Sequence, residues 1–184
     1  LGPLRVVQQP GMHRSGLVMA GDIAVEISTS RLRSRSLLQS WLKHLLAQLD
    51  DSPCNTAVVC RQDGSAKADQ FQIAMRWKAM TPPEAEQQIS LLQALAQQGA
   101  DVCWPVPPES GLARALSWSK GEEAANRAFI NRWQGSFSLW PERDQAEQTL
   151  CFGSHCDAEL LMHHASFEAA FQALYEPLLE ARCA

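Results

Sequence analysis

The sequence lacks the patterns that identify several common enzyme classes. No serine lies in a G-x-S-x-G turn, and no glycine-rich loop of the phosphate-binding type is present. No apolar run approaches the roughly 18 residues expected of a membrane span. These absences argue against a hydrolase with a nucleophile elbow, against nucleotide hydrolysis and against a protein that crosses a membrane.

An excess of positive charge is also missing. The 184 residues include 16 lysines and arginines against 20 acidic residues, which gives a formal net charge of −4. A protein that holds nucleic acid by bulk electrostatics is normally basic. Any contact with DNA must therefore come from a local patch.

A dense cysteine framework is missing as well, although the chain has six cysteines. They are scattered at Cys54, Cys60, Cys103, Cys151, Cys156 and Cys183. No hydrophobic signal segment accompanies them, so we expect reduced thiols and a cytoplasmic location.

Potential metal ligands gather in one stretch near the C-terminal end. They are Cys151, His155, Cys156, His163 and His164. Zinc sites use paired ligands at short, regular separations, and this spacing matches no common zinc finger or knuckle. We interpret the stretch as thiols and surface histidines in a loop, and we predict no metal and no cofactor.

Two segments have the alternation of β-hairpins. Residues 17–27 and 57–78 alternate apolar and polar side chains, and each is interrupted by a turn that contains glycine and aspartate. In the second segment, Phe71, Ile73, Met75 and Trp77 recur at every second position and are expected on one face. These patterns predict a small β-sheet.

Helical spacing predicts the next elements. Apolar residues three and four apart predict a helix over Leu37 to Leu49, with Trp41, Leu42, Leu45 and Leu49 on one broad apolar face. A second helix starts at a capping box and stops at a glycine, with Thr81 followed by Glu84 and ending at Gly99.

The C-terminal half is expected to be mostly helical. A capping box of Ser119 and Glu122 predicts a helix that buries Ala125, Phe129 and Trp133. Two hairpins that alternate with helices and then a run of helices predict the α+β class.

The domain organisation follows from length and composition. Residues 1–15 are predicted to form an irregular leading segment, and residues 16–184 a single domain. Because the sequence opens at Leu1 rather than at a methionine, we interpret it as a fragment of a longer polypeptide.

Four segments resemble one known family in their order and spacing. A proline-rich stretch ending in Pro-Glu-Ser-Gly (residues 108–111) precedes a long helix that ends in an aromatic residue and glycine. A basic lead into a leucine and tryptophan helix covers residues 31–49, Arg143-Asp144 matches part of a Gly-Glu-Arg-Asp-like turn, and residues 166–180 match a closing helix. In this order the segments resemble the C-terminal domain of RecC, the gamma chain of exodeoxyribonuclease V. Pro141 stands where that turn usually has glycine.

The resemblance implies the fold of a PD-(D/E)xK nuclease without its active site. An active member needs an aspartate and an acidic-x-Lys triplet, because two carboxylates hold Mg²⁺ and the lysine helps to activate water. Asp22 and Glu26 fall near these positions, but Ser28 stands where the lysine belongs, and no Asp-x-Lys or Glu-x-Lys triplet occurs in the chain. The plainer interpretation makes Asp22 a turn residue and Glu26 a solvent-facing strand residue. We predict no catalytic residue.

One positive cluster is a candidate DNA contact. Arg31, Arg33 and Arg35 precede and begin the first helix, with Lys43 further along it. Arginines at a helix N-terminus oppose its dipole and favour an anionic partner such as phosphate. The alternative is that they simply point into solvent.

A second, weaker patch lies in the second hairpin. Arg76 and Lys78 flank Trp77, which is expected to be a core residue rather than a platform for stacking bases.

The resemblance implies a role in DNA repair and recombination. In that family the subunit assembles with RecB and RecD subunits into a helicase and nuclease that processes broken DNA ends. The chain would then be a non-catalytic scaffold for its partners and for DNA ends. Two alternatives stay open: an active Mg²⁺-dependent nuclease with relocated site residues, and a protein-interaction domain without a DNA role.

Overall fold

A computed structural model describes residues 17–50, 52–61, 71–136 and 139–183. The chain separates into two compact units. The first holds Leu1–Leu91 with Glu180–Ala184, and the second holds Leu92–Leu179. The predicted irregular segment lies outside the described residues, and a single domain from residue 16 onward stays a prediction.

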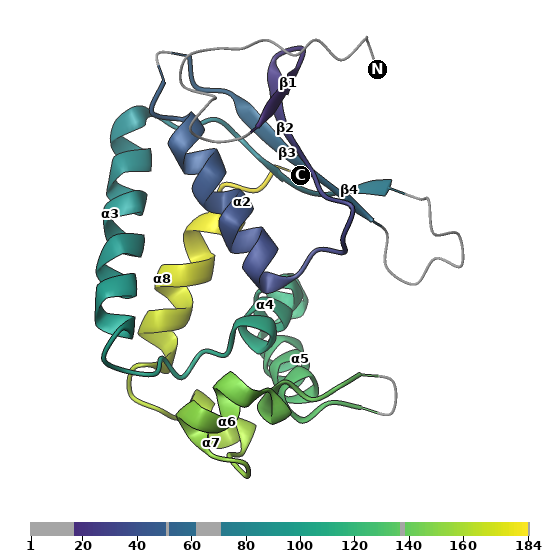
Figure 1. Ribbon diagram of the computed structural model, residues 1–184, viewed down its shortest axis with the longest axis vertical. Coiled ribbons are helices and arrows are strands. Elements are labelled where there is room, and N and C mark those ends of the chain that lie inside the picture. Colours follow the sequence, from purple (N-terminus) through teal and green to yellow (C-terminus); the bar gives the residue numbers. More distant parts are fainter. Residues whose placement is uncertain (1–16, 51, 62–70, 137–138, 184) are drawn as a thin grey trace. The chain divides into compact units, whose positions relative to one another are not determined.

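The first unit contains a mixed sheet of four described strands in the order β1-β2-β3-β4 (Figure 1). These are β1 (Val18–Ala20), β2 (Ile23–Ile27), β3 (Asn55–Arg61) and β4 (Phe71–Trp77). The pairs β1–β2 and β3–β4 are antiparallel, which confirms both predicted hairpins, whereas β2 and β3 are parallel. Gly21 supplies the positive φ of 70° in the first turn, and the second turn lies outside the described residues.

One face of this sheet is covered by helix α2 (Ser34–Ala47). Trp41 of the helix contacts Trp77 of β4, with ring centroids 5.3 Å apart. His44 of the helix shares a hydrogen bond of 2.8 Å with the hydroxyl of Thr56 on β3. The predicted core position Leu45 is fully buried. The parallel connection between β2 and β3 therefore runs through a helix that packs on the sheet.

The apolar face predicted for α2 is wrong at two positions. Leu42 and Leu49 are 40% and 39% exposed, while the polar His44 and Gln48 are fully buried. The sheet receives the stripe of residues 37, 41, 44, 45 and 48, so two leucines of the sequence pattern turn outward. The chain offers more apolar positions around this helix than one packed face can take.

The predicted face of β4 is also wrong in part. Met75 and Trp77 are buried, but Phe71 and Ile73 are 51% and 48% exposed. The register explains the difference, because Val58 pairs with Met75 and the next residue of β3 pairs with Ile73. Ala74 is the extra residue of a β-bulge, which turns the first part of β4 to the opposite face.

The last residues of the chain lie along β4 within the first unit. The Lys78 N–H donates to the Ala181 carbonyl and the Cys183 N–H donates to the Arg76 carbonyl, both at 2.9 Å. This part of the β4 edge is therefore paired.

Helix α3 (Pro82–Gly99) begins as predicted at Thr81, whose N–H donates to the Glu84 carboxylate at 2.7 Å. The described helices of the second unit are α4 (Pro108–Ser117), η1 (Trp118–Lys120), α5 (Glu122–Gln134), η2 (Glu142–Asp144), α6 (Ala146–Phe152), α7 (Ala158–Met162) and α8 (Phe167–Glu180). The α+β class with a helical C-terminal half is thus confirmed. No helix in the described part of the chain is both long and apolar enough to span a membrane.

The predicted capping box of α5 is wrong. Ser119 lies in η1, and Gly121 with a φ of 99° separates that turn from α5, which starts at Glu122. The glycine resets the chain direction, so Glu122 is the first helical residue and does not reach back to Ser119. The predicted buried face of α5 is confirmed at Phe129 and Trp133.

Candidate functional site

The carboxylate of Glu26 lies on the covered side of the sheet. By register Glu26 pairs with the buried Val58, and its side chain is 17% exposed. Its Oε1 is 2.5 Å from Lys43 Nζ of α2, and its Oε2 has no hydrogen-bond partner in the described structure. The prediction of a solvent-facing position is therefore wrong, and the structure brings together two candidates that the sequence had assigned to different sites.

The other two degenerate positions do not join this pair. Asp22 lies in the exposed turn between β1 and β2, and its charge acts on Cys54. Four strand residues at about 3.3 Å each place Asp22 roughly 13 Å from Glu26 along the chain. Ser28 follows β2, and its hydroxyl accepts a hydrogen bond from the Ser30 N–H. Within the described ranges, no three His, Cys, Asp or Glu side chains are close enough to hold a metal ion.

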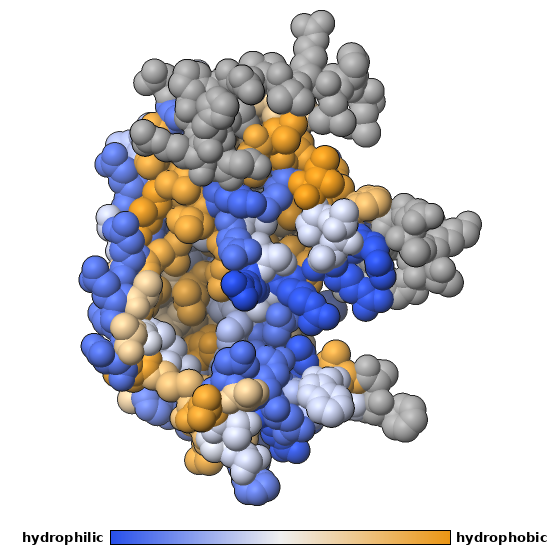
Figure 2. Space-filling view, viewed as in Figure 1, coloured by the Kyte–Doolittle hydropathy of each residue, from blue (hydrophilic) through white to orange (hydrophobic). Residues whose placement is uncertain are grey.

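The arginine cluster lies at the start of α2. Arg31, Arg33 and Arg35 are exposed, and the first turn of the helix carries no acidic residue. Figure 2 shows strongly hydrophilic side chains over this end of the helix. Ser36 accepts a hydrogen bond from the Arg33 N–H at 2.9 Å and so holds the first turn. Lys43 forms an ion pair with Glu26.

Sequence reasoning missed the buried histidine beneath α2. His44 stacks on Trp41 with ring centroids 5.1 Å apart and is fully buried. Burial lowers the pKa of His44 to about 4, because its imidazolium would be desolvated, and its Nε2 lacks a partner in the described structure. The signal was present in the sequence, since His44 occupies a core-facing position three residues after Trp41.

A second missed residue organises the helical unit. Glu142 is buried, and its Oε1 accepts a hydrogen bond from the Glu109 N–H at 2.8 Å. Its Oε2 accepts from the N–H and the hydroxyl of Ser110, both at 2.6 Å. These N–H groups belong to the first turn of α4, which leaves its donors without partners inside the helix. Glu142 therefore caps α4 from a distant point in the sequence.

Close packing at the start of α4 explains why the Pro-Glu-Ser-Gly segment ends in glycine. A Cβ at Gly111 would lie 2.8 Å from Tyr175 Cε2 and 2.9 Å from Val106 Cγ1, closer than real contacts allow. The Tyr175 hydroxyl donates to the Pro108 carbonyl at 2.8 Å. Three of the segments that carry the family resemblance therefore meet at the start of α4. They are the Pro-Glu-Ser-Gly segment, the turn with Arg143-Asp144, which is preceded by Glu142, and the closing helix, which contributes Tyr175.

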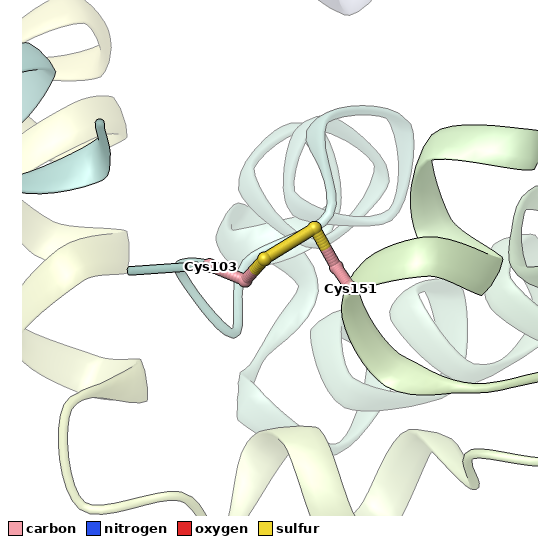
Figure 3. The surroundings of a disulfide bond; sticks show 2 residues. All are labelled: Cys103 and Cys151. Atoms are coloured by element: carbon pink, nitrogen blue, oxygen red, sulfur yellow. A yellow bond between two sulfur atoms is a disulfide. The ribbon is translucent and has the colours of Figure 1, made fainter. Parts of the chain in front are cut away.

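The cysteines differ from the expectation of reduced thiols. Cys103, in the loop after α3, and Cys151, in α6, form a disulfide with their Cα atoms 5.8 Å apart (Figure 3). Forty-eight residues separate them, so spacing could not indicate the pair. The bond also removes Cys151 from the stretch of potential metal ligands, where His164 instead contacts the Ser166 hydroxyl.

Comparison with known proteins finds one matching family. A family model described as the RecC C-terminal domain matches residues 6–119, more than half of the chain. The match includes the sheet, α2 with its arginines, and the Pro-Glu-Ser-Gly segment. No curated protein matches the chain.

Stability should depend on pH through His44. The unfolded chain binds the proton more tightly, so stability contributed by neutral His44 is complete above pH 6.5 and is lost as the pH falls towards 4. Between pH 6.5 and 5 the parent should lose roughly 2 kcal/mol more unfolding free energy than His44→Asn. Urea unfolding at both pH values measures this, with the exposed His163→Asn as control. Both proteins contain the same carboxyl groups, so protonation of those groups contributes equally to the two losses. Equal losses in the parent and His44→Asn would therefore show that His44 does not cause the pH dependence.

Replacing Glu142 by glutamine should destabilise the second unit. The carboxylate accepts three hydrogen bonds, whereas an amide offers one oxygen and turns its NH₂ towards a donor. We expect Glu142→Gln to lower the unfolding free energy by about 2 kcal/mol. The exposed Glu176→Gln on α8 should change it by less than about 0.5 kcal/mol. Denaturant unfolding of both variants measures the two changes. Equal unfolding midpoints for Glu142→Gln and Glu176→Gln would refute the capping role of Glu142.

Proposed function

The chain belongs to the RecC C-terminal domain family, and on this premise we propose that it is a non-catalytic domain of a RecC-like subunit. It acts in the cytoplasm within an exodeoxyribonuclease V of the RecBCD type, which processes double-strand breaks for homologous recombination. Its role is to bind RecB-like and RecD-like partners and to support DNA ends at the fork. Helicase and nuclease chemistry reside in the other subunits.

The contact between Glu26 and Lys43 supports the absence of catalysis. A lysine ammonium at 2.5 Å already compensates Glu26, the one carboxylate that the described strands place on the covered face of the sheet. Mg²⁺ prefers several oxygen ligands at about 2.1 Å and dehydrates reluctantly. Asp22 is four strand residues away, and Ser28 brings no charge. A nuclease-like sheet is therefore proposed to survive here as a scaffold.

The same contact is the one observation that favours an active nuclease. Lys43 supplies from α2 the cation that the sequence lacks beside Glu26, as a relocated lysine would. The missing part is a second carboxylate within reach of the same ion. The non-catalytic proposal therefore needs a direct test.

The isolated chain should release no nucleotides from linear DNA in the presence of Mg²⁺. Single carboxylates seldom hold this ion, so Asp22→Ala and Lys43→Ala should behave as the parent does. Release of acid-soluble nucleotides from labelled linear DNA is the measurement, with heat-denatured protein as control. Cleavage that disappears in Asp22→Ala would establish the active nuclease instead.

The arginine cluster should matter only in the assembled complex. With a net charge of −4, the isolated chain is expected to bind DNA weakly near physiological salt, where exposed charges act over only about 8 Å. Arg31→Glu, Arg33→Glu and Arg35→Glu combined should change stability by about 0.5 kcal/mol or less per site. The triple variant should nevertheless weaken DNA-end binding and unwinding by the complex.

A salt titration of DNA-end binding by the complex provides the readout. Losing phosphate contacts lowers the slope of log affinity against log salt. A triple variant that assembles and unwinds DNA like the parent at every salt concentration would show that the arginines are only solvated surface. A control with Lys120→Glu and Arg127→Glu, both exposed in the second unit, should leave unwinding unchanged.

A further inference from the structure

The sheet has a second face that α2 does not cover, here called the open sheet face. By strand register it consists of Val18, Ala20, Ile23, Val25, Ile27, Asn55, Ala57, Val59, Arg61, Phe71, Ile73 and Arg76. Of these, only Ala57 is buried. Ile27 is 57% exposed, and Phe71 and Ile73 are about half exposed because of the bulge at Ala74.

The charge on the open sheet face has one sign. Arg61 and Arg76 are its only ionisable strand residues, and the exposed Lys78 directly follows β4. The one acidic residue of the described strands, Glu26, points to the other face and pairs with Lys43. In a chain with a net charge of −4, the described strand residues of this face therefore carry cations and no carboxylate.

The arrangement of these groups alternates cation and apolar surface. Arg61 and Phe71 are direct cross-strand partners, so their side chains lie next to each other. Val59 pairs with both Ile27 and Ile73, which makes an apolar row beside them. Arg76 pairs with Ala57, four residues before Arg61, so the two arginines lie roughly 13 Å apart along the strands.

We propose that the open sheet face binds single-stranded nucleic acid. A single strand has unstacked bases that stack on an aromatic ring and phosphates that follow a positive track. Phe71 stacks a base, the row of Ile27, Val59 and Ile73 contacts the next bases, and Arg61 and Arg76 hold the flanking phosphates. A purely apolar partner would leave the two arginines without a role. This surface is separate from the arginines of α2, and its binding does not depend on the proposed role of that cluster.

The test measures binding of the full chain to a fluorescent oligothymidine of about 16 nucleotides, the upper site size of one compact single-strand binding fold. Anisotropy is recorded from low to physiological salt, because phosphate contacts weaken as salt rises. The variants are Arg61→Glu with Arg76→Glu, and Phe71→Ala. Their controls are Lys120→Glu with Arg127→Glu, which has the same charge change, and Trp140→Ala, which removes an aromatic side chain that is 74% exposed.

The parent should bind saturably at low salt. The double arginine variant should raise the dissociation constant at least about tenfold and lower the salt slope by about 1.4, which is 0.7 for each of two lost phosphate contacts. Phe71→Ala should weaken binding about tenfold with an unchanged slope, as loss of one stacked base does. Both controls should bind as the parent does, and circular dichroism should show an unchanged sheet in every variant.

Three outcomes would overturn the proposal. They are no saturable binding by the folded parent at low salt, equal binding by Phe71→Ala and the parent, and equal loss in the charge-matched control. In the same assay the combined Arg31, Arg33 and Arg35 variant separates the two ideas. If only that variant loses binding, the open sheet face is refuted. If only the Arg61→Glu with Arg76→Glu variant and Phe71→Ala lose binding, the open sheet face is supported, and the role of the arginines of α2 is decided by the salt titration of the assembled complex.

Discussion

His44 joins α2 to the sheet through a buried polar contact in a layer built largely from apolar side chains. Its hydrogen bond to Thr56 joins helix and strand, while Trp41 and Trp77 enclose the ring. A helix held only by leucines could rotate with little loss, but a buried polar pair loses its partner on rotation. The contact lies on the face of the sheet that α2 covers. It also places Lys43 beside Glu26 and leaves the arginines of the first turn outward.

The second unit depends on a comparable polar contact at Glu142. Its carboxylate takes the place of a local cap, because Pro107 at the N-cap has no side-chain acceptor. The segments that carry the family resemblance therefore have a structural reason to occur together. Ser110 supplies a donor, Gly111 leaves room for Tyr175, and Glu142 joins them. Pro141 before Glu142 adopts an extended conformation, so the turn forms without the usual glycine.

Much of the fold was predictable because its signals are local. The hairpin around Gly21, the start of α3 at Thr81 and the buried face of α5 follow from turn chemistry, capping and spacing. The outward turn of Leu42 and the reversal at Ala74 were not predictable, because both are decided by what lies across the sheet. For the site, the sequence indicated that Glu26 lacks its neighbouring lysine, but it could not place Lys43 beside it. That contact requires the packing of α2, which no local pattern specifies.

The bulge at Ala74 also bears on how readily another chain could pair with the edge of the sheet. β4 is an edge strand, and a regular edge with exposed Phe71 and Ile73 would invite another chain to extend the sheet. The last residues of the chain pair with β4 at Arg76 and Lys78, and the bulge interrupts the row of N–H and C=O groups next to that paired part. A strand from another chain therefore cannot form an uninterrupted row of hydrogen bonds along β4. An apolar surface can stay accessible to a ligand here with a reduced risk of aggregation.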